Sequence, residues 1–288
     1  MGPAATFGAE LDAATTALEA AGLASARVEA EWLLAGLLGV GRVGVRLDLA
    51  GTLPEPLAER YAHAVRRRAS REPLQRILGW EEFRGVRVRL TEAVLVPRPE
   101  TETLVEWALE LLPPPAAGRR VLAIDVGTGS GCIACALAAE RSDLDVVAID
   151  VSPAAAAVAR ENVRALQLSA RIRVVVADLL DGISDPGADL IVSNPPYLPT
   201  ALVSELPPEV RTHDPMLALD GGADGLALIR RIAAVARRGL CSSGVLVVET
   251  AGAAQAPATA ALFQAAGFAQ VAVRADLAGI DRFVAGRA

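Results

Sequence analysis

Short apolar runs alternate with helical segments from residue 121 onward, and this alternation constrains the fold more than any other feature of the sequence. Runs that are apolar throughout are typical of parallel strands buried on both faces. The predicted strands cover residues 121–125, 146–150, 172–176, 189–193 and 245–249, with closing strands around Val271 and Phe283. The pattern predicts an α/β fold with a doubly wound, mostly parallel sheet and an antiparallel closing strand, which binds its ligand at the carboxyl ends of the strands.

Residues 1–72 have helical periodicity instead, which predicts a small N-terminal helical bundle that recognises a substrate. Two apolar faces are expected, one with Leu11, Ala14, Leu18 and Ala21 and the other with Val28, Trp32, Ala35 and Leu38. The three arginines at 66–68 are expected to form a solvated helix end. Apolar and polar residues alternate around Gly85, so residues 73–92 are predicted to be a β-hairpin linker and 93–288 the larger domain.

Composition excludes several classes of protein. The chain has 288 residues, of which 52% are hydrophobic, so it can bury a large core. Its net charge of −6 argues against a protein that grips long nucleic acid, and we expect no direct nucleic-acid binding. The apolar runs are too short to span a bilayer and the N-terminus does not look like a signal peptide, so we expect a cytoplasmic protein without membrane contact.

The three cysteines do not suggest a disulfide framework or a metal site. Cys132 and Cys135 share one face of a predicted helix, but the other soft ligands are scattered along the sequence. We therefore interpret both thiols as small packing residues and expect no metal.

A glycine-rich segment follows the first strand of the alternating region. Gly127, Gly129 and Gly131 let a ligand approach the backbone closely, and Asp150 ends the next strand, where a carboxylate can accept both hydroxyls of a ribose. The spacing predicts a nucleotide-type site. A nicotinamide cofactor would normally require a Gly-x-Gly-x-x-Gly pattern, which this loop does not have.

The strand at 189–193 leads directly into Asn194-Pro195-Pro196-Tyr197. Because proline fixes its own φ and restricts the residue before it, the Asn194 side chain and the Pro195 carbonyl are held in a narrow range of geometries. Two such acceptors suit a substrate NH2 group, and Tyr197 offers a flat face for the attached planar group. A proline-rich loop that simply ends a core strand would have the same sequence, so the motif alone leaves both interpretations open.

The two motifs together resemble those of Rossmann-like methyltransferases that use S-adenosylmethionine, including enzymes that act on planar amino or amide nitrogens. In that resemblance the loop Asp125-Val-Gly-Thr-Gly-Ser-Gly131 is the cofactor loop. It implies that Asp125 faces the methionine end of the cofactor, Asp150 the ribose, and Asp178 with Leu179 the adenine.

Over nearly its whole length the chain resembles the bacterial peptide-chain release factor glutamine methyltransferase family. The residues that carry this resemblance lie at 97–102, 125–131, 192–197, 219–226 and 276–284, and more weakly in the helical region. The resemblance implies methyl transfer to the glutamine side-chain nitrogen in the Gly-Gly-Gln loop of class-one release factors, with S-adenosyl-L-homocysteine as the second product. Glu249-Thr250-Ala251-Gly252 and Leu179 depart from the family's usual residues, which puts details of the cofactor pocket in question.

The resemblance also implies a role for each site residue. Asn194 and Pro195 are the expected catalytic residues. The expected cofactor-binding residues are Asp125, Gly127, Thr128, Gly129, Ser130, Gly131, Asp150, Asp178, Leu179 and Asn194, and the expected substrate-binding residues are Asn194, Pro195, Pro196, Tyr197, Arg98 and Glu100. Two alternatives stay open: an adenine methyltransferase that acts on nucleic acid, and a non-catalytic binding module associated with translation.

Overall fold

The computed structural model describes residues 6–114, 118–183 and 186–288, and the chain divides into two compact units. The first unit contains the described chain up to Trp80 together with Pro207–His213. The second unit contains Glu81–Leu206 and Asp214–Ala288. The chain therefore leaves the second unit after residue 206 and re-enters it at residue 214.

The first unit is helical, as its periodicity predicted. Its described helices are α1 (Phe7–Ala20), α2 (Ala26–Leu38), α3 (Arg42–Leu47), α4 (Glu55–Ala69), α5 (Leu74–Leu78) and α9 (Pro208–His213). Leu11, Leu18 and Leu34 are fully buried between these helices, and the buried Tyr61 donates a hydrogen bond to the Ala30 carbonyl. Several of these helices are too short to be stable alone, so packing on a shared core holds them together.

The predicted apolar face of α2 was wrong for Val28, whereas Ala35 is buried in the core and Leu38 packs against it. Val28 is 38% exposed, whereas Leu33 and Leu34 are buried in the core. Glu31 lies on the buried side, where its carboxylate forms ion pairs with three arginines, Arg27, Arg42 and Arg46. These cations compensate for the burial of the Glu31 charge. The side of α2 that carries Glu31 can therefore face the core, although the hydrophobic pattern alone predicts that this side faces solvent.

The prediction of a solvated arginine cluster was wrong for Arg68. Its side chain is only 8% exposed, and its guanidinium forms an ion pair with Glu29. The same guanidinium donates to the Glu72 carbonyl. Arg67 binds the Glu72 carboxylate, so the end of α4 is fixed by charged contacts within the unit.

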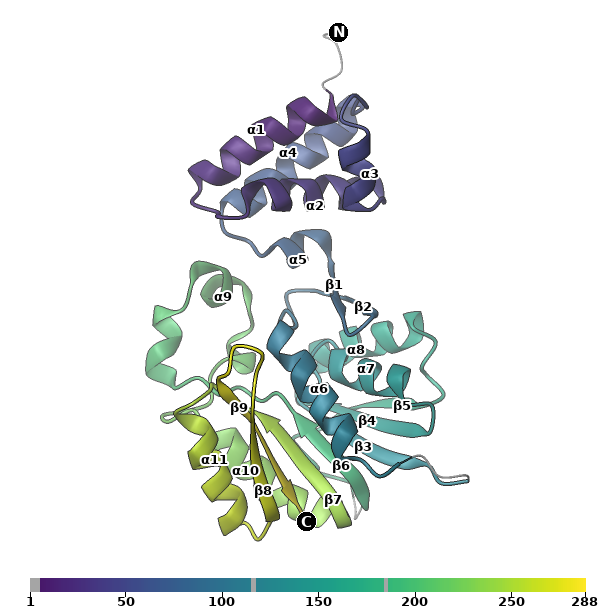
Figure 1. Ribbon diagram of the computed structural model, residues 1–288, viewed down its shortest axis with the longest axis vertical. Helices are drawn as coiled ribbons and strands as arrows, with labels where there is room; N and C mark the ends of the chain where they lie inside the picture. The colour runs from purple at the N-terminus through teal and green to yellow at the C-terminus, as the bar shows by residue number, and fades with distance from the viewer. Residues whose placement is uncertain (1–5, 115–117, 184–185) are drawn as a thin grey trace. The chain divides into compact units, whose positions relative to one another are not determined.

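The second unit is built on a seven-stranded sheet with the order β5-β4-β3-β6-β7-β9-β8 (Figure 1). The strands are β3 (Val121–Val126), β4 (Leu144–Asp150), β5 (Ile172–Val176), β6 (Ala188–Ser193), β7 (Leu240–Glu249), β8 (Ala269–Ala275) and β9 (Asp281–Arg287). The first five of these pair in parallel, and β9 is antiparallel to both of its neighbours. This confirms the predicted doubly wound sheet with an antiparallel closing strand.

Helices cover both faces of the sheet. In β6, Leu190 and Val192 pack into a core with α6 (Pro99–Leu111), α7 (Cys132–Glu140) and α8 (Pro153–Ala165). Ile191 points to the opposite face, where the core includes residues of α10 (Ala227–Gly239) and α11 (Gln255–Ala265). Burial on both faces explains why the strands have continuous apolar sequences.

The shorter elements of the second unit lie in its connections. The hairpin consists of β1 (Trp80–Phe83) and β2 (Val86–Arg89), as predicted around Gly85, and two 3₁₀ turns, η1 (Thr200–Glu205) and η2 (Met216–Ala218), follow β6. After β3 the chain builds β4 and β5 on one side and then returns to add β6 on the other. That reversal separates the loops after β3 and β6 and opens a crevice at the strand ends. In the described part of the chain, no helix is long and apolar enough to cross a membrane.

Candidate functional site

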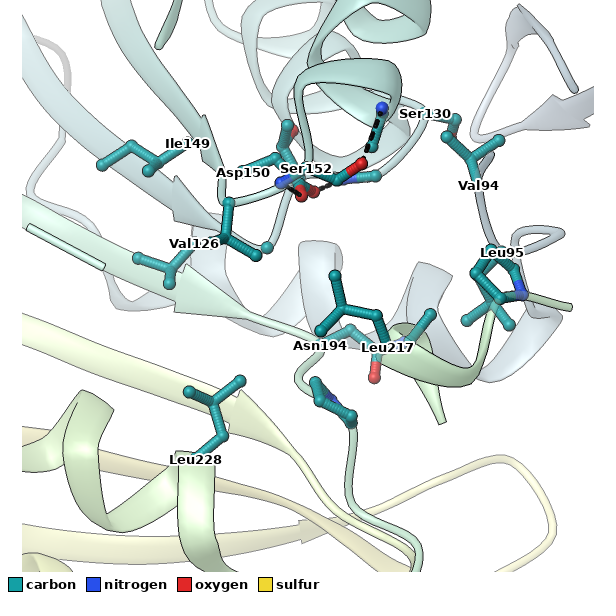
Figure 2. Close-up of a pocket in the computed structure, with 18 of the residues that line it drawn as sticks. Val94, Leu95, Val126, Ser130, Ile149, Asp150, Ser152, Asn194, Leu217 and Leu228 are labelled. Atoms are coloured by element: carbon teal, nitrogen blue, oxygen red, sulfur yellow. Dashed lines mark hydrogen bonds between the residues drawn. The ribbon is translucent and has the colours of Figure 1, made fainter. Parts of the chain in front are cut away.

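A cavity of about 600 Å³ lies in the second unit at the carboxyl ends of the parallel strands. Its volume is in the range usual for small-molecule sites. Figure 2 shows Asp150 and Ser152 on one side of this cavity and Asn194 with Leu217 on the other, with Val94 and Leu95 forming part of the wall. Of the expected site residues, ten line it: Arg98, Gly127, Thr128, Gly129, Ser130, Asp150, Asp178, Leu179, Asn194 and Pro196.

The loop after β3 is folded by its own backbone. Gly127 and Thr128 both donate their amide hydrogens to the Ile149 carbonyl at the end of β4. Gly127 and Gly129 have φ values of 73° and 54°, which glycine adopts without the strain that a side chain would cause. A Cβ at either position would meet no atom within 4 Å, so the backbone here faces open space that a ligand can enter.

Asp150 fixes this loop and also faces the cavity. Its Oδ2 accepts a hydrogen bond from the Gly129 amide at 2.8 Å, and its Oδ1 accepts one from the Ser152 amide at 2.9 Å. A carboxylate oxygen has two lone pairs, so each oxygen can accept one further hydrogen. The carboxylate is therefore held in place and can still accept two hydroxyl groups of a ligand.

Asp125 is fully buried under the same loop and does not line the cavity. Its Oδ2 accepts a hydrogen bond from the Thr128 hydroxyl at 2.5 Å, while Oδ1 has no hydrogen-bond partner within the described chain. Burial raises the pKa of Asp125 to about 7, and the nearby charge of Asp150 adds to this, although the bond from Thr128 opposes it. An unpaired carboxylate oxygen this close to the loop suits a cationic ligand group.

Asp178 and Leu179 lie after β5. The Asp178 carboxylate accepts a hydrogen bond from Arg231 at 2.8 Å, and all three side chains reach the cavity. Leu179 is 6% exposed and has a φ of 54°, an uncommon conformation for a residue with a large side chain. Such backbone strain is found most often at ligand sites.

Asn194 connects the cavity to a buried polar network. Its Nδ2 donates to the Thr101 hydroxyl at 3.0 Å, and that hydroxyl donates to Glu249 Oε2 at 2.8 Å. The Tyr197 hydroxyl contacts the other oxygen of Glu249 at 3.4 Å. Burial raises the pKa of Glu249 to about 7. Within the described residues, Asn194 Oδ1 accepts no hydrogen bond, so it is available to a ligand in the cavity.

Five of the expected site residues do not line the cavity, and they are Asp125, Gly131, Pro195, Tyr197 and Glu100. Gly131 caps α7 with a φ of 81°, and Pro195 is buried behind the turn. Glu100 is exposed in the first turn of α6. Arg98 does reach the cavity, and its guanidinium forms an ion pair with Asp214 at 2.8 Å.

The glycine-rich segment at 219–226 packs against the residues that follow the turn at Asn194, and Gly221 and Gly222 of this segment also line the cavity. The Leu198 amide donates to the Leu219 carbonyl, and the Gly221 amide donates to the Leu198 carbonyl at 2.8 Å. A Cβ on Gly225 would lie 2.2 Å from the Tyr197 carbonyl oxygen. Gln255 donates to that same carbonyl at 2.8 Å. Glycine is therefore required at position 225 by the close approach of two backbone segments.

Four residues of this site were missed by the sequence analysis. They are Thr101, Arg231, Glu249 and Asn162, the last of which donates to the Ser130 carbonyl of the glycine loop at 2.8 Å. Each acts through a side chain that is distant in sequence from its partner, so no local pattern marks it. Thr101 lies within the stretch 97–102 and Glu249 within the departure at 249–252, but neither was given a role in the site. Thr101 and Arg231 line the cavity, whereas Glu249 and Asn162 do not.

The two thiols of α7 are packing residues. Both are buried, and burial raises the pKa of Cys132 and of Cys135 to about 12, so neither is a thiolate at neutral pH. In the described segments of the chain, no three His, Cys, Asp or Glu side chains gather in an arrangement that could hold a metal ion.

The residues around the cavity fit S-adenosylmethionine. The glycine backbone leaves open space, Asp150 offers acceptors for ribose hydroxyls, and the buried, unpaired Oδ1 of Asp125 lies beneath the loop. Leu179 and Leu228 supply apolar surface for a flat ring. Together these groups match the polar, cationic and aromatic parts of this cofactor.

Comparison with known proteins gives closely related sequences. The PrmC N-terminal domain family matches residues 11–79, and the methyltransferase small domain family matches residues 106–204. The release factor glutamine methyltransferase of Geobacter sulfurreducens is 45% identical over 92% of this chain and 91% of its own length. The protein of the same name from Cereibacter sphaeroides is 43% identical over 96% of both chains.

Solved structures with the same fold are more distant in sequence. The hMettl16 catalytic domain in complex with MAT2A 3′UTR hairpin 6 aligns with a TM-score of 0.58 at 19% identity, over 83% of this chain and 85% of that one. A methyltransferase from Pyrococcus furiosus aligns with a TM-score of 0.52 at 15% identity, over 70% and 89% of the two chains. At these identities the likeness extends to the fold alone.

Proposed function

Because the chain belongs to the release factor glutamine methyltransferase family, and is thus an S-adenosylmethionine-dependent methyltransferase, we propose that it methylates the glutamine side-chain nitrogen in the Gly-Gly-Gln loop of class-one release factors. The observation that carries the proposal is the free Oδ1 of Asn194 at the cavity wall, held by a network that uses its nitrogen. A release factor substrate would place the enzyme in the cytoplasm, where translation takes place.

Each proposed role follows from the chemistry of an amide. The nitrogen lone pair of a carboxamide is delocalised, so the amide must be aimed more than activated. In the proposed complex, Asn194 Oδ1, which lies at the cavity wall, accepts an N–H hydrogen of the amide and points the nitrogen at the methyl group. Good alignment of this kind contributes up to roughly 7–11 kcal/mol of barrier lowering.

The remaining residues hold the two substrates. When bound, S-adenosylmethionine supplies a methyl group that is carried on a cationic sulfur. After the transfer, that sulfur is the neutral thioether of S-adenosyl-L-homocysteine. We assign the ribose to Asp150, the adenine to the pocket at Asp178 and Leu179, and the cationic end to the loop above Asp125. Arg98 and Pro196 line the side of the cavity where we place the glutamine. The amide loses one proton to solvent during or after the transfer.

We also propose that the helical unit recognises the protein substrate. The family match to residues 11–79 supports this proposal, because a domain separate from the methyltransferase region is shared by the family. The unit has a cavity of its own, of about 410 Å³, with Leu33, Leu37 and Ile77 in its wall and Arg60 and His63 among its polar residues. An apolar floor with charged residues around it suits a protein surface.

Mass spectrometry of a class-one release factor incubated with the enzyme and S-adenosylmethionine tests the proposed reaction. We expect one methyl group on the glutamine of the Gly-Gly-Gln loop. A glutamate variant of the substrate has no NH2 to donate to Asn194 Oδ1, so we expect it to be rejected strongly. Methylation of adenine-containing DNA under the same conditions, with none on the release factor, would overturn the substrate assignment.

A further inference from the structure

Three side chains that are far apart in sequence form one chain of hydrogen bonds behind Asn194. Thr101 lies in the first turns of α6, Glu249 ends β7, and both are buried, at 2% and 1% exposure. The Thr101 hydroxyl donates to Glu249 Oε2 at 2.8 Å and accepts from Asn194 Nδ2 at 3.0 Å. Glu249 does not line the cavity, so its contact with the site runs through other side chains.

The number of hydrogens available in this series of hydrogen bonds decides which way the Asn194 amide faces. A hydroxyl has one hydrogen, and Thr101 donates it to a carboxylate oxygen. Toward Asn194 the same hydroxyl can therefore act only as an acceptor, which requires the amide NH2. The amide oxygen then faces the cavity. Without Glu249 the hydroxyl could donate to the amide oxygen, and the amide could turn its NH2 toward the substrate.

Glu249 also fixes the aromatic end of the same motif. Its Oε1 accepts a long hydrogen bond of 3.4 Å from the Tyr197 hydroxyl, while its Oε2 accepts one from the Thr101 hydroxyl. Above its raised pKa of about 7, Glu249 is ionised, and both of its oxygens then accept hydrogens from hydroxyl groups. One buried carboxylate at the end of β7 therefore orients the first and last residues of Asn194-Pro195-Pro196-Tyr197.

We propose that Thr101 and Glu249 are positioning residues that keep the Asn194 carboxamide oxygen directed at the substrate NH2. This inference rests on the proposed function, since it assumes that Asn194 Oδ1 accepts a hydrogen from an amide. The pair sets which hydrogen-bonding group the cavity presents, so it determines selectivity for a substrate that donates hydrogens. Because Glu249 does not line the cavity and the Thr101 hydroxyl is already used by Glu249 and Asn194, we expect the pair to affect the rate more than the binding of S-adenosylmethionine.

Substitutions at Thr101 distinguish the effect of its hydroxyl group from the effect of its size. Thr101→Val keeps the shape and removes the hydroxyl, and we expect kcat to fall about 10- to 100-fold, since the acceptor is no longer aligned. Thr101→Ser restores the hydroxyl and should return kcat to within about threefold of the wild type. The affinity for S-adenosylmethionine, measured by calorimetry, should change less than about twofold in both variants.

Thr259 provides a matched control. It is a fully buried threonine in α11, and its hydroxyl has no hydrogen-bond partner within the described chain. Thr259→Val repeats the same chemical change away from the cavity, so kcat should stay at the wild-type level. A similar fall in kcat for Thr259→Val and Thr101→Val would assign the effect to general packing and overturn the inference.

A double-mutant cycle tests whether Thr101 acts through Asn194. We expect Asn194→Ala to lower the single-turnover rate, and Thr101→Val to cause no further loss in that background. Additive losses would overturn the inference. Glu249→Gln leaves one acceptor oxygen for two hydroxyls, so it should lower the rate about three- to tenfold and should also be silent in the Asn194→Ala background. It carries the test if Thr101→Val does not fold.

The outcomes separate this inference from the function on which it rests. If the wild-type enzyme does not methylate the glutamine protein, or if Asn194→Ala is fully active, the proposed function fails. If Asn194→Ala is impaired but Thr101→Val and Glu249→Gln are not, the proposed function stands and the positioning role is wrong.

Discussion

At the scale of single residues, the Asp150 carboxylate both fixes the glycine loop and faces the cavity. It accepts the amides of Gly129 and Ser152, and it keeps one lone pair on each oxygen for the cavity. In the proposed complex, the loop conformation and the binding of the ribose would therefore be coupled, because the residue that would bind the ligand also shapes the loop around it.

Asp150→Ala should weaken the binding of S-adenosylmethionine by at least about 100-fold. The variant loses two charge-assisted hydrogen bonds, each contributing roughly 1.5–3 kcal/mol, and it releases the loop. Titration calorimetry measures the affinity. Asp145→Ala is the matched control, since Asp145 is on the same strand, is half-exposed and pairs with Arg120 away from the cavity. Equal affinities in the two variants would remove Asp150 from the cofactor site.

Asp125 gives the stability of the free protein a dependence on pH. Burial raises the pKa of this carboxyl from 3.8 to about 7, so between these values the folded protein holds a proton that the unfolded chain releases. The free energy of unfolding should therefore fall as pH rises through this window, by an amount on the order of 1–4 kcal/mol. Asp125→Asn cannot ionise, so chemical denaturation at pH 5 and pH 8 should show a smaller fall than in the wild type. An unchanged pH dependence would contradict the assignment.

At the scale of elements, two loops fold against each other to build the turn at Asn194–Tyr197. The segment at 219–226 forms backbone hydrogen bonds to Leu198, and Gly221 and Gly222 of this segment also line the cavity. Its glycines allow the two backbones to approach closely, and Gln255 from α11 joins them. The position of Tyr197 therefore depends on a segment that lies outside the motif.

Gly225→Ala should lower kcat about tenfold or more while changing the affinity for S-adenosylmethionine by less than about threefold. The added methyl group would lie 2.2 Å from the Tyr197 carbonyl oxygen, so the turn must shift, and small misplacements of catalytic groups are costly. Gly279→Ala is the control, because Gly279 has a similar φ of 79° but open space around its Cβ position. A larger loss of kcat in the control would show that backbone strain, rather than the clash, is responsible.

The sequence predicted the elements far better than it predicted the contacts between them. Buried parallel strands are apolar throughout and end at polar residues, so β3, β4 and β6 were located together with Asp150 and Asn194. The link between Thr101 and Glu249 joins residues that are 148 positions apart, and neither has a local pattern that marks a partner. The face of α2 was misjudged for a related reason, since the arginines that allow Glu31 to be buried include Arg42 and Arg46 from another helix.

At the scale of the whole molecule, the chain builds two units with separate cores and separate cavities. The larger unit holds every residue proposed for the reaction. The smaller unit has its own charged cavity rim, with Arg60 and His63 exposed on α4. If the smaller unit recognises the protein substrate as proposed, this division allows substrate recognition and chemistry to be altered independently.

Arg60→Glu should raise the KM for an intact release factor about three- to tenfold and leave kcat unchanged. The reason is that reversing a charge at the rim of an interface mainly weakens association. The Arg60→Glu variant should methylate a short peptide that contains Gly-Gly-Gln at the same rate as the wild type does. Such a peptide would contact only the larger unit. Arg66→Glu on the same helix is the control, because Arg66 is exposed and does not line the smaller cavity. An equal rise in KM for both variants would indicate a general effect of charge.

The smaller unit also contains Pro207–His213, a short segment made long after its other helices. There Glu209 binds Arg71 at 2.6 Å and approaches Arg68 at 3.6 Å. A ribosome that synthesises this chain releases the N-terminal helices first, and Glu209 emerges only after most of the sheet's parallel strands have been made. During synthesis, the ion pairs of Glu209 with Arg68 and Arg71 can therefore form only after this downstream segment has been made. The N-terminal unit begins to fold first but is completed late.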